Sequence, residues 1–264
     1  MWSKYLQTAK ITWNERLEYR LSFVLWRVRV VLQVLVVYFV WLAVFTNRSQ
    51  VFGYTQSMML TYILLSSLIR SVVFATTTME IHSLINQGTL SFFLIKPVRF
   101  FRYYMARDAA DKLLNIIFSV GEVALIIAVF APPVFIQSDV WAIFRSLLAT
   151  GLGLGLYFYF SIFLSLLGFW TPDVWAPRFL SFVIMEFFAG SLFPLDILPQ
   201  ALYNISRAFP FYYMLYLPLK TYLAKNPEDF TADMIIGIIW LVLLNLAARF
   251  IWQRGVRSFS AEGR

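Results

Sequence analysis

The sequence predicts an all-α membrane protein, and its composition and the pattern of its apolar stretches lead to that fold class. The 264 residues are 60% apolar and 19% aromatic, and only 14% are charged. Soluble domains carry about 25% charged residues, so this chain lacks the side chains to cover a water-facing surface. The apolar stretches are long and lack the alternation of barrel strands, and helices are the other structure that satisfies backbone hydrogen bonds in lipid. We therefore expect a bundle of transmembrane helices.

Six segments are long and apolar enough, or nearly so, to cross a bilayer, which takes about 20 residues. They cover residues 23–45, 58–79, 113–135, 141–169, 179–198 and 234–251. The fourth is long enough to tilt, and Pro194 and Pro199 interrupt the fifth. No repeat of fixed period and no low-complexity linker divides them, so residues 1–264 are expected to form one domain.

Residues 1–22, before the first span, have the pattern of an amphipathic helix that lies in the membrane interface. Apolar residues recur there every three or four positions, with charged residues mostly between them. They are Trp2, Tyr5, Leu6, Ala9, Trp13, Leu17 and Leu21. A polar tail without fixed structure is the alternative. The segment is too polar for a signal peptide, so the first span is expected to target the chain.

The basic residues indicate how the bundle is oriented. An even number of spans leaves both termini on one side, and roughly three basic residues lie on that side for each one on the other. The minority side holds Arg48, Arg145, Arg207, Lys220 and Lys225. We expect both termini in the cytoplasm and the chain in the cell (inner) membrane. The formal charge of +8 lies mainly beside the spans, which favours anionic lipids over nucleic acid as the partner.

Two connections between spans are long. The cytoplasmic connection, 80–112, begins with a stretch that predicts a short helix ended by Gly88. The external connection, 194–233, is rich in Leu, Ile, Phe and Tyr, so we expect it to fold back into the outer leaflet as short broken helices.

Several kinds of chemistry find no support in the sequence. No glycine is followed by lysine, as a phosphate-binding loop requires, so any ATP would be used by another polypeptide. There is no cysteine, and no nucleophile-elbow motif accompanies the single histidine, His82, so Ser-His-Asp hydrolysis is not supported. The run Gly151-Leu-Gly-Leu-Gly155 lies inside an apolar span. The small residues at 151, 155, 161, 165 and 168 instead indicate close approach of a neighbouring helix.

Three ionisable residues fall within spans, where charge is costly and usually faces protein or water. They are Arg70, Glu122 and Glu186, all at similar mid-membrane depth. One interpretation is an Arg70–Glu122 pair that ties neighbouring helices together. The other is a polar lining for a substrate path, or a proton site.

The order of these parts resembles the permease subunits of ABC-2 type transporters, over essentially the whole chain. The external residues Gly190-Ser-Leu-Phe-Pro194-Leu-Asp196-Ile-Leu-Pro199, followed by Pro210-Phe-Tyr-Tyr213, look like the re-entrant half-helices of that family. The cytoplasmic Ile85-Asn-Gln-Gly88-Thr-Leu90 and Leu94-Ile-Lys96-Pro97 are similar to a bacterial branch that includes viologen exporters.

This resemblance implies a separate ABC ATPase subunit that binds ATP and Mg, with no cofactor on this chain and no catalysis by it. It also implies a second permease subunit, identical or homologous. The coupling helix, between the second and third spans, would dock on the ATPase through Glu80, His82, Ile85, Gln87, Gly88 and Leu90. Substrate would leave the cytoplasm or inner leaflet between the subunits, and the external segment would act as a lid.

Two other classes of function stay open at this point. An ion-coupled carrier would use Glu122 or Glu186, but such carriers often repeat a broken helix in both halves, and this chain breaks one span. A membrane-embedded enzyme should gather catalytic groups at one face, whereas the acidic residues here are scattered. The apolar composition favours an amphipathic or hydrophobic substrate without identifying it.

Overall fold

The computed structural model describes residues 3–18, 20–224 and 229–259. Trp2, Lys225, Glu228 and Arg264 lie outside these residues. The chain begins with α1 (Ser3–Glu18), α2 (Arg20–Val44), β1 (Gln50–Val51), β2 (Tyr54–Thr55) and α3 (Gln56–Val73). It continues through α4 (Glu80–Asn86), α5 (Leu90–Leu94), α6 (Phe100–Phe130), α7 (Val140–Leu166), the 3-10 turn η1 (Leu167–Phe169) and α8 (Trp175–Phe188). The last elements are η2 (Leu195–Ile197), α9 (Gln200–Ala208), α10 (Pro210–Met214), α11 (Tyr216–Tyr222) and α12 (Phe230–Ser258).

Within the described residues, five helices are long and apolar enough to cross a membrane, namely α2, α3, α6, α7 with η1, and α12. The expected span 179–198 does not form as one helix. The 14-residue α8 ends at Phe188, because Gly190 takes a left-handed conformation (φ 73°) and Pro194 follows. Two helices also differ in extent from the expected spans: α3 ends at Val73, before 79, and α6 begins at Phe100, before 113.

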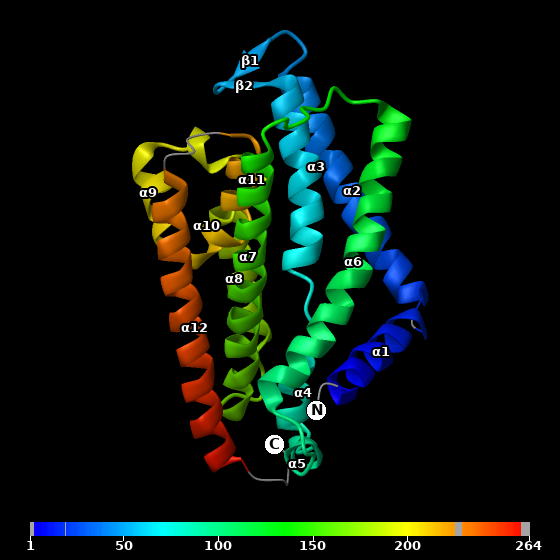
Figure 1. Ribbon diagram of the computed structural model, residues 1–264, viewed down its shortest axis with the longest axis vertical. Helices are drawn as coiled ribbons and strands as arrows, with labels where there is room; N and C mark the ends of the chain where they lie inside the picture. The colour runs from blue at the N-terminus through cyan, green and yellow to red at the C-terminus, as the bar shows by residue number, and fades with distance from the viewer. Residues whose placement is uncertain (1–2, 19, 225–228, 260–264) are drawn as a thin grey trace.

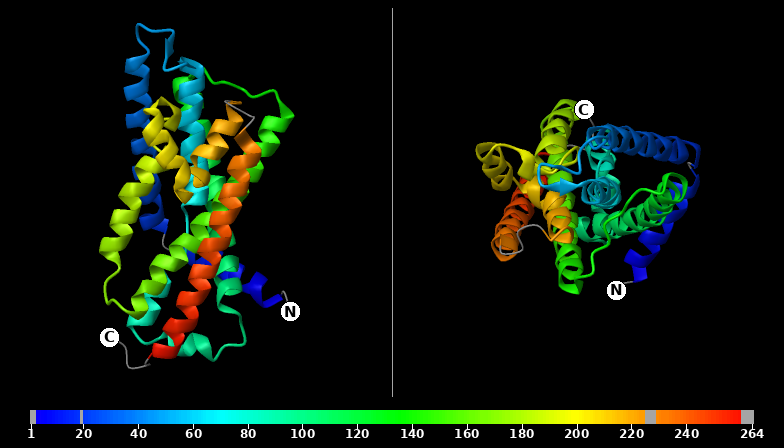
Figure 2. Two further views of the ribbon diagram at one scale, coloured as in Figure 1. Left: turned by 90° about the vertical axis from the view of Figure 1, so that its left-hand side faces the viewer. Right: turned by 90° about the horizontal axis from the view of Figure 1, so that it is seen from above.

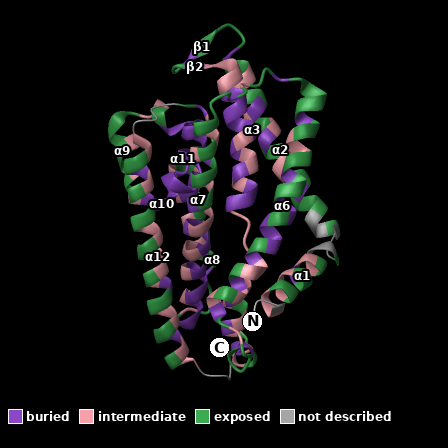
Figure 3. Ribbon diagram, in the orientation of Figure 1, coloured by how far each residue is buried: buried purple, intermediate pink, exposed green. Residues whose placement is uncertain are grey.

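The long helices run side by side and differ in how far they are buried (Figures 1 and 2). In the most apolar 18-residue window of each, 61% of α3 and 67% of α7 is buried, against 17% of α2, 22% of α6 and 11% of α12. Figure 3 shows the exposed outer faces of α2, α6 and α12 in green. α3 and α7 therefore form the centre, and the apolar outer faces of the other three are suited to lipid.

The two ends of the bundle carry different elements (Figure 1). The described residues nearest both termini lie at one end with α4, α5 and η1. The β1–β2 hairpin and α9 lie at the other end. The hairpin turns through Phe52 and Gly53, both with positive φ, as a tight two-residue turn requires. Thr55 then caps α3, since its hydroxyl accepts a hydrogen bond from Met58 N at 3.3 Å.

Small residues let other elements approach α7 closely, as the sequence predicts, although not at every position. A Cβ added to Gly155 would lie 3.0 Å from Leu241 of α12, and one added to Gly168 would lie 2.7 Å from His82 of α4. Gly151 is exposed, so its assignment to packing was wrong. Gly153, which the sequence analysis did not single out, makes the closer approach: a Cβ there would lie 2.6 Å from the carbonyl oxygen of Met214 in α10.

This difference between two glycines of one helix gives a prediction. Gly153→Ala should lower the stability of the purified protein by about 1–3 kcal/mol, because backbone and not a movable side chain blocks the added methyl group. Gly151→Ala should leave stability unchanged or raise it slightly, since helical glycine costs about 0.5–1 kcal/mol relative to alanine. Thermal unfolding of both variants in detergent checks this. Equal melting temperatures for the two would contradict the proposed contact.

Candidate functional site

α4 and α5 form a short helical pair at the end of the bundle that also carries α1 and η1. α4 ends where Gly88 takes φ 72°, so the predicted helix with a glycine stop is confirmed. Ile81, Ile85, Leu90 and Phe93 point inward and pack with aromatic and aliphatic residues of α6, α7, η1 and α12. These four side chains anchor the pair to the central helices.

The exposed surface of this pair is more apolar than the sequence analysis anticipated. Of the six residues assigned to coupling, Gln87 is exposed, whereas Ile85, Gly88 and Leu90 are buried. The largest exposed side chains are instead Phe92 (66% exposed) and Ile95 (81%). Phe92 and Ile95 are large apolar residues in a connection that was expected to face water. That combination was the feature of the sequence that could have predicted this exposed apolar surface.

Glu80 and His82 are held within the fold. Glu80 lies 3.2 Å from Arg107 of α6, and Arg107 also binds Glu15 of α1 at 2.8 Å. The ring nitrogen Nε2 of His82 accepts a 3.0 Å hydrogen bond from the side-chain amide of Asn86. Burial, with the nearby Arg178, holds the pKa of His82 below its ordinary value. His82 therefore favours the neutral form at pH 7.

The connection between α3 and α4 is fixed by two charged residues of α6. The ammonium group of Lys112 donates to the carbonyl oxygens of Val72 (3.0 Å), Val73 (3.1 Å) and Ala75 (2.6 Å), at the end of α3. Asp108, one turn earlier, lies 3.3 Å from Lys112 and accepts from Thr77 N at 3.3 Å. These contacts, which we call the Asp108–Lys112 clamp, join the end of α3 to the start of α4.

The charges inside the bundle are paired, but not as expected. Arg27 of α2 binds Glu122 of α6 and also donates to Asn115 at 3.2 Å. Arg70 of α3 binds Glu186 of α8. The expected Arg70–Glu122 pair was therefore wrong. Arg27 is buried (5% exposed) although it lies near the expected start of the first span.

The segment 190–222, from the end of α8 to α11, is held in place by hydroxyl groups. Tyr54 of the hairpin donates to Asp196 at 2.8 Å, and Tyr62 of α3 donates to the carbonyl oxygens of Gly190 and Phe193 at 2.5 and 3.3 Å. Pro194 and Pro199 flank η2, and Pro210 begins α10. α10 and α11 are almost wholly buried and lie against α7. This packing explains the apolar character of the segment.

The buried charges near α10 and α11 also form a closed network. Lys220 of α11 and Arg207 of α9 lie 3.6 and 2.6 Å from the fully buried Asp233 of α12. Arg207 lies against Oδ1 of that carboxylate, and Tyr212 donates to Oδ2, the oxygen nearest Lys220, at 3.2 Å. This network ties the short helices to the beginning of α12.

The Asp108–Lys112 clamp makes a measurable prediction. Lys112→Met removes three charge-assisted bonds, each worth about 1.5–3 kcal/mol, so amides 74–79 should exchange with solvent at least about tenfold faster. Hydrogen exchange measured by mass spectrometry checks this. Lys96→Met, which changes an exposed lysine, is the control and should leave that segment unchanged. Unaltered exchange in the Lys112 variant would refute the clamp.

The two buried ion pairs should differ in their effect on folding. Glu122→Gln leaves Arg27 without its carboxylate inside the bundle, and breaking such a pair costs about 3–5 kcal/mol. Glu186→Gln should cost less, because the Arg70 side chain is 28% exposed. Melting in detergent ranks the two. The double variant Arg27→Met/Glu122→Met should recover stability relative to Glu122→Gln, and failure of that recovery would mean that the Arg27–Glu122 pair is not what stabilises these helices.

The arrangement of long apolar helices around a central pair, with an anchored helical pair at one end, agrees with a comparison against protein families. The model of the ABC-2 family transporter proteins matches residues 31–263. A search of curated proteins gives no match. The match begins within α2 and covers nearly all of the remaining chain, including α4, α5 and the helices α9 to α11. The chain belongs to the ABC-2 family of transporter proteins, as a membrane-embedded permease subunit.

Proposed function

We propose that this permease exports an amphipathic or hydrophobic substrate, driven by a separate ATPase subunit that docks on α4 and α5. The observation that carries the proposal is the contrast between the two faces of this pair. One face is buried against the central helices, and the other exposes Phe92 and Ile95. Because burying apolar surface yields about 25 cal/mol per Å², the exposed face is suited to a protein partner.

Movement of α4 would reach the centre of the bundle through the Asp108–Lys112 clamp. Thr77 N and three carbonyl groups at the end of α3 are bonded to α6, so α3, α4 and α6 should move together. Closure of two ATPase subunits around ATP and Mg would shift this unit and switch the permease between inward-open and outward-open states. The permease itself would hold no nucleotide.

The proposed topology has six crossings, with α8 and the residues up to η2 as the fifth. The 14 residues of α8 cover about 21 Å at 1.5 Å per residue, less than the roughly 30 Å hydrocarbon core. The α10–α11 segment would fill the rest of the hydrocarbon core from the external side. Its backbone is buried in protein, as non-helical or broken structure within a membrane must be. Both termini would be cytoplasmic, and α1 would lie along the membrane surface.

The pairing of the intramembrane charges supports transport powered from outside this chain. Glu122 and Glu186 are each neutralised by an arginine, which argues against a free proton site on either residue. The Arg70 side chain is 28% exposed and that of Arg27 only 6%, so Arg70 and Glu186 are better candidates for the substrate path than Arg27 and Glu122. A second permease, identical or homologous, would form the other wall, and the segment from Pro194 to Pro210 would close the path outside.

The docking surface can be tested with two matched isoleucines. Ile95→Asp places a charge on the exposed face of the α5 end, and it should abolish co-purification of the ATPase subunit from membranes of the native host. Ile136→Asp is the control, because Ile136 is equally exposed (78% against 81%) but lies at the opposite end, between α6 and α7. Retention of the ATPase by the Ile95 variant at the control's level would rule out this surface.

A further inference from the structure

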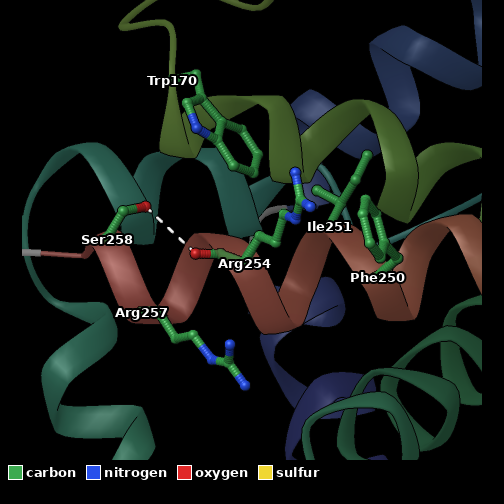
Figure 4. Close-up of a pocket in the computed structure, with 6 residues that line it drawn as sticks. All are labelled: Trp170, Phe250, Ile251, Arg254, Arg257 and Ser258. Atoms are coloured by element: carbon green, nitrogen blue, oxygen red, sulfur yellow. Dashed lines mark hydrogen bonds between the residues drawn. The ribbon is translucent and has the colours of Figure 1, made fainter.

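A cavity of about 480 Å³ opens at the end of α12 nearest the C-terminus (Figure 4). Trp170, which follows η1, faces Phe250 and Ile251 of α12 across it. Arg254, Arg257 and Ser258 complete the lining. In Figure 4 the side chain of Arg254 lies on the side of Trp170, whereas Arg257 leaves the helix on the opposite side. Apolar walls and a cation therefore meet in one open cavity.

Arg254 is arranged to accept an anion. Its guanidinium group lies over the ring of Phe250, 4.4 Å from the centroid, so one face of the cation is covered. The N–H donors in the guanidinium plane are left for an oxygen ligand, and their fork matches phosphate geometry. Arg254 forms no salt bridge with any residue that the structure describes. The charges of this cavity are therefore not neutralised by neighbouring carboxylates within the described chain.

The position of the cavity along α12 points to a lipid as the source of that anion. The 29 residues of α12 are about 43 Å long, more than the roughly 30 Å hydrocarbon core, so its last turns extend to headgroup depth. Trp170 is about half exposed, and tryptophan is enriched at this depth of membrane proteins. Phe250 is also exposed and lies on the membrane side of Arg254. A phosphate at Arg254 would leave its acyl chains beside Phe250 and Ile251.

We propose that this cavity binds the headgroup of an anionic phospholipid from the inner leaflet, with Arg254 on the phosphate and Trp170, Phe250 and Ile251 against the glycerol and upper acyl chains. The assignment to the inner leaflet rests on the proposed topology, in which this end of α12 is cytoplasmic. Binding itself needs neither the ATPase nor a transported substrate. Its failure would therefore leave the proposed export function standing.

Native mass spectrometry of the purified full chain tests the site with phosphatidylglycerol, phosphatidylcholine and soluble glycerol phosphate as probes. We expect phosphatidylglycerol to bind more tightly than phosphatidylcholine, and Arg254→Gln to weaken its binding about fivefold, the effect of one basic residue near an anionic surface. Trp170→Ala should also weaken binding. Arg102→Gln, which removes one exposed charge from α6 at the same end of the bundle, should not.

Three results would overturn the proposal. Equal weakening by Arg102→Gln and Arg254→Gln would mean general attraction of anionic lipid to a basic surface. Equal binding of phosphatidylglycerol and phosphatidylcholine would mean that the site does not select a lipid of net negative charge. Binding of glycerol phosphate as tight as that of the lipid would identify a site for free phosphate compounds instead.

Discussion

The contact of Lys112 with the last carbonyl groups of α3 is the interaction on which the α4 end of this structure depends. A helix leaves its final carbonyl groups without partners, and inside an apolar bundle water cannot supply them. Here an ammonium group from α6 donates to three carbonyl oxygens, and Asp108 balances its charge. α3 can therefore end inside the protein, and the chain can turn directly into α4.

The same constraint explains how charges are distributed through the bundle. Burying an isolated charge is costly, so each charge inside must be neutralised close by. Arg27 with Glu122 and Arg70 with Glu186 join helices that are distant in sequence, and Lys220 with Asp233 joins the consecutive helices α11 and α12. These pairs restrict the relative positions of α2, α6, α3, α8, α11 and α12. Lipid-facing packing alone would specify those positions only weakly, because lipid chains are as apolar as the helix surfaces.

The features that follow from local sequence were predictable. Apolar runs located most of the long helices, Gly88 marked the end of α4, and Pro194 marked the break after α8. The errors arose where distant residues decide the outcome. The apolar and threonine-rich residues after Val73 continued the pattern of a span, but Lys112 ends α3 there. A connection was expected up to 112, whereas α6 already begins at Phe100 and carries Asp108 and Lys112, which bond to the residues around the end of α3. Arg27 could be assigned to Glu122 only once α2 and α6 were placed side by side.

The central claim is that work enters this permease from an ATPase bound at α4. The chain contains no cysteine, so single cysteines can report this contact directly. We would place one at the exposed Gln87 and, as a control, one at the exposed Ser138 at the opposite end, and apply a short thiol-to-amine crosslinker to native membranes. The account predicts an adduct with an ATPase subunit from position 87 and none from position 138. The account would be contradicted if position 87 gave no adduct although a water-soluble maleimide labels its thiol as readily as a free surface thiol.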